Sequence, residues 1–152
     1  GVKVAYDFNL RLKLWDLETA RQVIHATARR ADVLLPSLDE ARVLTALEDP
    51  TEILEFYAGL DSEIVALKRG EDGVTVFAGG MRQTILPPEV TVVDTSGAGD
   101  TFAGGFLARL AIGDNPYDAA RYGVVAASLS TTGFGAISPI PGREAVQAAL
   151  AS

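Results

Sequence analysis

The sequence has no cysteine and only one histidine, His25. The missing cysteines exclude disulfides, thiolate nucleophiles and cysteine-type zinc sites, and a single histidine excludes a histidine-rich metal site. No stretch approaches the roughly 20 consecutive apolar residues of a membrane-spanning helix. The apolar run at the start is too short for a signal peptide, because Asp7 follows Tyr6 directly. These absences fit a cytoplasmic protein.

Basic residues are also scarce. The 13 Lys and Arg against 20 Asp and Glu give a net charge of -7 at pH 7. An acidic surface repels phosphate backbones and anionic lipids, so we expect neither a nucleic acid nor a membrane as partner. A phosphorylated small molecule is still compatible, because a local nest of backbone N–H groups holds phosphate whatever the global charge. The 152 residues, 48% of them hydrophobic, suffice for one domain with a sizeable core.

Strands and helices are expected to alternate along the chain, which predicts an α/β fold. The pattern favours a mostly parallel sheet flanked by helices, with an antiparallel extension over residues 64–86 that contains two tight turns. Strands are expected at residues 2–6, 32–35, 64–68, 73–77 and 81–86, and helices at residues 17–30, 38–47, 50–58, 98–112, 116–130 and 143–151.

The most informative motif is Asp94-Thr-Ser-Gly-Ala-Gly-Asp100, at the start of an expected helix. Gly97 and Gly99 remove side chains where backbone N–H groups would approach an anion. The positive N-terminal end of the helix favours an ionised carboxylate in its first turn, so Asp100 is poised to accept a proton from an alcohol. A plain helix start with an early aspartate explains the same residues without chemistry. The spacing fits neither a Rossmann fingerprint nor a Walker A loop.

Residues 94–102 closely resemble the C-terminal signature of the PfkB (ribokinase-like) carbohydrate kinases. The order of the expected elements resembles that family over nearly the whole chain. The resemblance implies a ribokinase-like fold and ATP-dependent phosphorylation of a sugar hydroxyl, with Mg²⁺ on the phosphates. It implies that the backbone of Gly97, Ala98 and Gly99 forms the anion hole and that Asp100 is the base.

The same resemblance bears on the extent of the chain. It implies that residues 1–152 are the C-terminal, nucleotide-binding part of a kinase domain whose N-terminal substrate and lid part is absent here. A homodimer formed through the lid is then expected only of the full-length protein. A nucleotide-binding fragment without turnover is the alternative to an active enzyme.

Two further segments resemble parts of the family that contact the nucleotide. Lys68-Arg-Gly70-Glu-Asp-Gly73 resembles a turn that lies along the ATP phosphates, although a simple hairpin turn also explains it. Ser37 and Glu40 resemble a Ser-x-x-Glu motif that helps to hold the magnesium nucleotide. The same spacing is a helix capping box, and the two roles are compatible.

The substrate is suggested by residues 7–15. Asp7-x-Asn9-x-Arg11-x-x-Leu-Trp15 resembles the segment of 2-keto-3-deoxygluconate kinases in which the arginine meets the acid sugar. A guanidinium group clamps a carboxylate well in bidentate fashion. Without the resemblance, a surface arginine beside a core tryptophan is the simpler interpretation. Fructokinase-like members carry a similar segment, so kinases of fructose, ribose or a nucleoside are alternatives.

A glycine-rich loop at residues 130–136 suits a hard monovalent cation, because its carbonyl groups are accessible. The resemblance implies a potassium ion held between this loop and the segment around residue 94; an ordinary loop is the alternative. The candidate ligands are Asp94, Ser96, Ser130, Gly133 and Gly135. His25 lies in the middle of an expected helix, where we predict a surface or partly buried residue without a chemical role.

Overall fold

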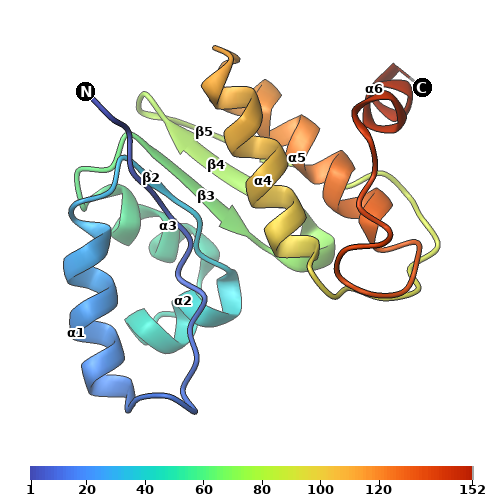
Figure 1. Ribbon diagram of the computed structural model, residues 1–152. Coiled ribbons are helices and arrows are strands. Elements are labelled where there is room, and N and C mark those ends of the chain that lie inside the picture. Colours follow the sequence, from blue (N-terminus) through green and yellow to red (C-terminus); the bar gives the residue numbers. More distant parts are fainter. Residues whose placement is uncertain (152) are drawn as a thin grey trace. The chain divides into compact units, whose positions relative to one another are not determined.

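The computed structural model describes residues 1–151, which divide into two compact units (Figure 1). The first unit comprises residues 1–70 and 75–83. The second comprises residues 71–74 and the described chain from residue 84 onward. The chain therefore passes between the units more than once, and each unit is described by itself.

A mixed five-stranded sheet flanked by helices confirms the expected α/β fold, with strand order β1-β2-β3-β4-β5. The pairs β1–β2 and β2–β3 are parallel. The connections from β3 to β4 and from β4 to β5 are too short for the crossover that parallel strands require, so these strands run antiparallel. The strands are β1 (Ala5–Tyr6), β2 (Val33–Leu34), β3 (Ile64–Lys68), β4 (Val74–Ala78) and β5 (Met81–Ile85).

The helices agree with the expected positions to within two residues at their ends. Three of them begin at side-chain caps, Asp16, Ser37 and Asp49, which accept backbone N–H groups of the first turn. The helices are α1 (Leu17–Ala28), α2 (Leu38–Thr45), α3 (Pro50–Ala58), α4 (Ala98–Ala111), α5 (Pro116–Ser130) and α6 (Arg143–Ala151), with a 3₁₀ turn η1 at Gly70–Asp72.

The start of the chain differs from the expected buried strand at residues 2–6. Val2 is 93% exposed and Val4 48% exposed, and β1 is confined to Ala5–Tyr6. The carboxylate of Asp32 accepts the N–H of Val4 at 2.7 Å and also pairs with Lys3. The Val4 N–H thus bonds a side chain in place of a backbone carbonyl, and the regular pairing with β2 begins only at Ala5.

The core of the first unit lies among α1, α2, α3 and the inner strands. Ile24 of α1, Tyr57 of α3 and Val65 of β3 are fully buried in it. Burying side chains of this size contributes about 1.5–3 kcal/mol each. His25 lies at the margin of this core, half-buried against Phe56 with a ring-centroid distance of 5.2 Å. The expected partly buried helical position is thereby confirmed.

The second unit is organised by the close packing of α4 against α5. A Cβ added at Gly123 of α5 would lie 2.9 Å from the Phe102 ring and from the Phe102 carbonyl oxygen of α4. Phe102 stacks on Phe106 with a centroid distance of 5.4 Å. The last helix, α6, attaches through Val146, which packs with Val125 of α5 and its neighbours.

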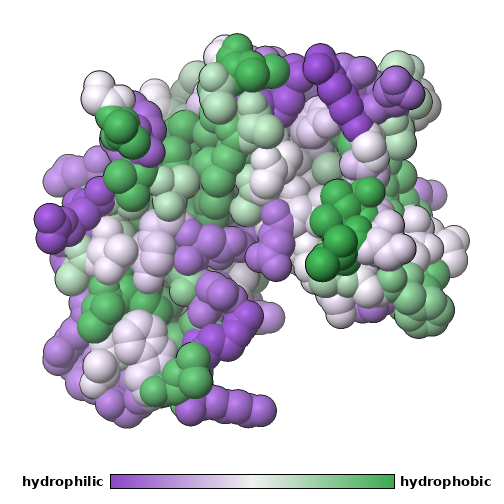
Figure 2. Space-filling model, viewed as in Figure 1, coloured by the Kyte–Doolittle hydropathy of each residue, from purple (hydrophilic) through white to green (hydrophobic). Residues whose placement is uncertain are grey.

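The surface mixes polar and apolar side chains, as Figure 2 shows for one face. Among the larger exposed apolar residues are Val2, Leu14, Phe134 and Ile137. Within residues 1–151, no helix is long and apolar enough to cross a membrane.

Candidate active site

The start of α4 presents backbone N–H groups and a carboxylate at the same place. Gly97 is the N-cap residue in a left-handed conformation, with φ 74°, and no side chain caps this helix. A helix leaves its first N–H groups without partners inside the helix, and such groups suit an anion. The N–H of Ala98, the first residue of α4, donates to the Thr95 carbonyl just before the helix, at 3.2 Å. Asp100 is exposed in the first turn beside them.

Gly97 is required by packing as well as by its backbone conformation. A Cβ added there would lie 2.9 Å from both the Cβ and the carbonyl oxygen of Ala136, in the loop after α5. The sequence had suggested only that a glycine lets an anion approach. The structure adds that the residue presses directly against this loop.

Asp94 ties the segment before α4 to the same loop. One carboxylate oxygen accepts the Ser96 N–H and the other accepts the Gly135 N–H, each at 2.9 Å. These hydrogen bonds from Gly135 and Ser96 lower the pKa of Asp94. The backbone N–H groups of Val93 and Asp94 also bond to the Thr131 carbonyl, at 2.8 and 3.1 Å. The segment that leads into α4 is therefore fixed at several points.

Only part of the predicted cation set converges. Asp94, Ser96 and Gly135 are joined by hydrogen bonds. The hydroxyl of Ser130 is instead buried and donates to the Ala127 carbonyl, and Gly133 packs against Pro139. A carboxylate such as that of Asp94 is chemically suited to a hard cation, and its oxygens already accept hydrogen bonds from Ser96 and Gly135. No cluster of three or more His, Cys, Asp or Glu within residues 1–151 could hold a metal ion.

In the first unit, charged side chains gather where the parallel strands end. Asp7 follows β1 directly, and Lys68 is the last residue of β3. The Lys68 ammonium donates to both carboxylate oxygens of Asp7, at 2.9 and 2.7 Å. Burial, followed by the nearby carboxylates of Glu40 and Asp7, raises the pKa of Tyr6, the last residue of β1. Ligand groups in open α/β sheets gather at this edge.

The capping-box interpretation of Ser37 and Glu40 is confirmed. The Ser37 hydroxyl accepts the Glu40 N–H, and a Glu40 carboxylate oxygen accepts the Ser37 N–H. The other Glu40 oxygen accepts the N–H of Leu10 at 2.8 Å, which the sequence did not suggest. Glu40 therefore connects the start of α2 to the segment that follows β1. A nucleotide role for Ser37 and Glu40 stays a prediction.

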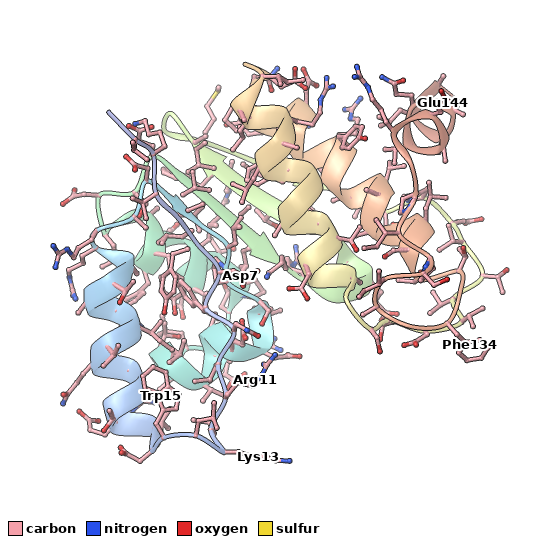
Figure 3. All side chains as sticks on the ribbon, viewed as in Figure 1. Asp7, Arg11, Lys13, Trp15, Phe134 and Glu144 are labelled. Atoms are coloured by element: carbon pink, nitrogen blue, oxygen red, sulfur yellow. The ribbon has the colours of Figure 1, made fainter. Side chains whose placement is uncertain are left out.

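Arg11 lies on that segment, as Figure 3 shows together with Asp7 and Trp15. It is exposed, and its guanidinium donates to the Leu10 carbonyl at 3.0 Å. Trp15 is half-buried and packs against the first core, as expected. Arg11 is thus an exposed residue on a segment whose start is held by the Asp7–Lys68 ion pair and the Glu40–Leu10 hydrogen bond.

The turn at Lys68, Gly70 and Gly73 follows β3. Gly70 and Gly73 both have positive φ, 60° and 79°. A Cβ at Gly73 would lie 2.0 Å from the Ile85 carbonyl oxygen, so close backbone contact alone requires glycine there, whereas a Cβ at Gly70 would meet nothing within 4 Å. Contact of this turn with a nucleotide stays a prediction.

Sequence reasoning missed the Asp7–Lys68 ion pair and the Glu40–Leu10 hydrogen bond. The available signal was that oppositely charged residues stand at the ends of two parallel strands.

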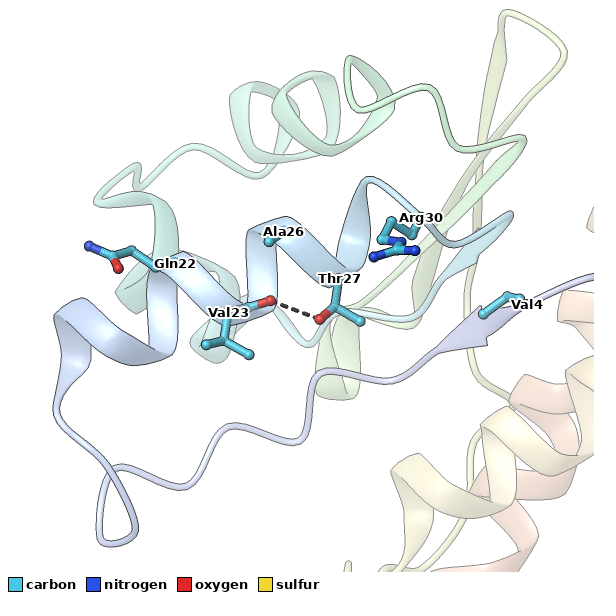
Figure 4. A pocket seen from close by; sticks show the side chains of 6 residues that line it. All are labelled: Val4, Gln22, Val23, Ala26, Thr27 and Arg30. Carbon is cyan, nitrogen blue, oxygen red and sulfur yellow. Dashed lines mark hydrogen bonds between the residues drawn. The ribbon is translucent and has the colours of Figure 1, made fainter.

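The open groove in Figure 4 is a separate feature of the first unit. None of the predicted site residues lines it; its residues are Val4, Gln22, Val23, Ala26, Thr27 and Arg30.

The chain is similar in sequence to known carbohydrate kinases. The profile of the pfkB family carbohydrate kinases matches residues 1–143. The 2-dehydro-3-deoxygalactonokinase of Haloferax volcanii is 34% identical over 142 residues, covering 92% of this chain and 45% of the relative. The 2-dehydro-3-deoxygluconokinase of Bacillus subtilis is 30% identical over 154 residues, covering 100% and 48%. The chain therefore spans about half the length of these curated relatives.

A solved structure extends the likeness to three dimensions. The fructokinase double mutant of Vibrio cholerae O395, with fructose, ADP and a potassium ion bound, superposes with a TM-score of 0.90 at 28% identity. The match covers 97% of this chain and 50% of that one.

Proposed function

Because the chain belongs to the pfkB family of carbohydrate kinases, we propose that the whole protein transfers the γ-phosphoryl group of ATP to a sugar hydroxyl, with Asp100 as the base. The observation that carries this proposal is the uncapped start of α4, where Asp100 is exposed beside backbone N–H groups that lack partners inside the helix. A base and an anion site in one helical turn are what phosphoryl transfer to an alcohol needs.

The proposed reaction follows from that arrangement. Asp100 takes the proton of the sugar hydroxyl, whose oxygen attacks the γ-phosphorus as the bond to the bridging oxygen of ADP breaks. The backbone of Gly97, Ala98 and Gly99 receives the charge on the transferred phosphoryl oxygens. Asp94 supports the geometry, because it holds the preceding segment to the loop at Gly135.

We place the nucleotide along Ser37, Glu40 and the backbone of the turn that contains Lys68, Gly70 and Gly73. Mg²⁺, when bound with the nucleotide, would neutralise charge on the phosphates. A monovalent cation, potassium in the first instance, would be held by Asp94 and neighbouring groups; Ser96, Ser130, Gly133 and Gly135 are the other candidates. The potassium reported for the Vibrio cholerae fructokinase supports this choice.

The substrate we favour is 2-keto-3-deoxygluconate, also named 2-dehydro-3-deoxygluconate. Arg11 would bind its carboxylate, since an exposed guanidinium on an anchored segment suits bidentate recognition. The names of the Haloferax volcanii and Bacillus subtilis relatives, both kinases of deoxy sugar acids, support an acid sugar. The likeness to a fructose-bound fructokinase favours fructose as the second candidate. A panel of acid and neutral sugars, scored by kcat/KM in the whole protein, separates the two.

The role of Asp100 is tested by Asp100→Asn in the whole protein. We expect kcat to fall on the order of 10²- to 10⁴-fold, because the amide cannot accept the proton, whereas the KM for ATP changes little. The matched control is Asp118→Asn, another aspartate in the first turn of a helix, and it should leave kcat unchanged. Nearly unchanged turnover in Asp100→Asn would refute the proposed base.

A second experiment concerns the chain of 152 residues itself. Calorimetry with ATP beside a coupled kinase assay distinguishes a nucleotide-binding part from a complete enzyme. Because the chain spans about half of its relatives, we expect ATP binding without turnover. Robust turnover would show instead that the sugar site needs nothing beyond these residues.

A further inference from the structure

The segment from Asp7 to Leu10 is held by three contacts of different kinds. The Asp7 carboxylate pairs with Lys68, with side chains 28% and 14% exposed. The Phe8 ring is 4% exposed and meets Tyr57 edge-on at a centroid distance of 5.0 Å. The Leu10 N–H donates to Glu40. An ion pair, a buried ring and a charge-assisted hydrogen bond thus fix four consecutive residues.

The ion pair reaches across the middle strand of the parallel part of the sheet. Asp7 follows β1, Lys68 ends β3, and β2 lies between them. The Lys68 backbone is fixed independently, because its N–H donates to the Pro36 carbonyl at 2.9 Å. The pair therefore anchors the segment after β1 to a strand two places away. Both side chains are partly buried, so removing one partner would leave the other charge unpaired and poorly solvated.

Beyond Leu10 the chain turns outward and is anchored again. The Leu14 N–H bonds the Arg11 carbonyl at 2.9 Å, so residues 11–14 form a tight turn. Trp15 then packs on the core, and Asp16 caps α1. Arg11 is the first residue of this turn. Its position consequently depends on the contacts made by residues 7–10.

From these contacts we infer that Asp7, Lys68 and Glu40 are positioning residues for Arg11, holding the segment that presents its guanidinium to the carboxylate of an acid sugar. The inference rests on the proposed function, because the substrate role of Arg11 is proposed there. It assigns the Lys68 side chain to the sugar side of the site, whereas the turn after Lys68 is proposed for the nucleotide. A clamp fixed before the substrate arrives loses less conformational freedom on binding.

The inference is tested in the whole protein with Asp7→Asn, Lys68→Met and the double variant. Each single change should raise the KM for 2-keto-3-deoxygluconate on the order of tenfold, and the double variant should raise it no further, as for residues that act together. The KM for ATP should stay near the wild-type value. The matched control is Lys3→Met, which removes a lysine that pairs with Asp32 and Glu63 before β1.

A measurement without turnover accompanies the kinetics. Amide hydrogen exchange of the peptide covering residues 7–15 should become faster in Lys68→Met, Asp7→Asn and Glu40→Ala, and should be unchanged in Lys3→Met. The double variant guards against misfolding, because it leaves no charge of the pair unpaired.

The outcomes separate the two proposals. A wild-type protein without kinase activity refutes the proposed function, and the exchange data still decide whether the contacts hold the segment. A raised KM for ATP with an unchanged KM for the sugar overturns the inference, since Lys68 would then be a phosphate ligand. Additive single changes, or exchange equal to the wild type, overturn it as well.

Discussion

Carboxylates bonded to backbone N–H groups recur at the residue scale and organise both parts of the proposed site. Glu40 accepts N–H groups of Ser37 and Leu10, and Asp94 accepts those of Ser96 and Gly135. Charge-assisted bonds of this kind are roughly twice as strong as neutral ones. Glu40 joins the start of α2 to the segment after β1, and Asp94 joins the segment before α4 to the loop after α5. In each case one side chain fixes the position of a segment distant in sequence.

For Asp94 this arrangement has a pH signature. Its pKa is lowered from the ordinary 3.8, so its bonds contribute stability above the unfolded-state pKa and lose it as the pH falls through the folded-state value. We expect the amide proton shifts of Ser96 and Gly135 to titrate together with a midpoint below 3.8. Asp94→Asn should abolish this step. A midpoint at or above 3.8 would contradict the prediction.

The sequence predicted those parts of the site that depend on neighbours along the chain. The Ser37–Glu40 capping box has a spacing of three residues, and the glycines before Asp100 mark a helix start. The Asp7–Lys68 pair is separated by 61 positions. Local patterns carry no information on which distant charges meet, so strand order had to be known first.

The packing of α4 against α5 is the dominant contact of the second unit at the scale of elements, and it depends on glycine. Gly105 of α4 and Gly123 of α5 face one another, and a Cβ at Gly105 would lie 3.3 Å from the Gly123 Cα. Such small residues let two helix backbones approach closely. Because α4 carries Asp100 at its start, this contact also sets the orientation of the proposed base.

A pair of glycine substitutions tests this packing. Gly123→Ala should lower the free energy of unfolding by about 1–3 kcal/mol, because the new methyl group meets the Phe102 ring and carbonyl. Gly104→Ala, within α4 but with nothing within 4 Å, should raise it by up to about 1 kcal/mol through helix propensity. Denaturant unfolding of both variants provides the measurement. Equal effects of the same sign would contradict the packing argument.

Helices were easier to predict than strands at this scale. The expected residues 116–130 and 143–151 are those of α5 and α6, and the Ser37 capping box is present as predicted. The first strand was predicted too long because Asp32 bonds the Val4 backbone. A helix cap depends on residues that are neighbours in sequence, whereas the end of a strand depends on a partner elsewhere in the chain.

At the scale of the whole molecule, an apolar sheet edge favours association between chains, whereas the negative net charge opposes it. Within the described residues β1 and β5 are the outer strands. The β5 edge carries exposed Arg82 and Gln83, whereas exposed Val2 and Val4 precede β1. An apolar edge favours pairing with another chain, and the net charge of -7 opposes it at neutral pH.

We therefore expect this chain of 152 residues to associate as the pH approaches its isoelectric point of about 4.6. Light scattering at fixed concentration between pH 7 and 4.6 provides the measurement. Val4→Lys should reduce association at a given charge more than Val43→Lys, which places the same change on helix α2. Equal effects of the two variants would attribute association to net charge alone.

The division into two units has a consequence for cutting the chain. The first unit includes residues 75–83, which follow residues 71–74 of the second, so neither unit is a continuous stretch. A truncation after Gly70 would remove β4 and β5 from the sheet and leave the outer side of β3 without its neighbour. The two units are thus interleaved in sequence, and the molecule has no point at which a single cleavage yields two intact halves.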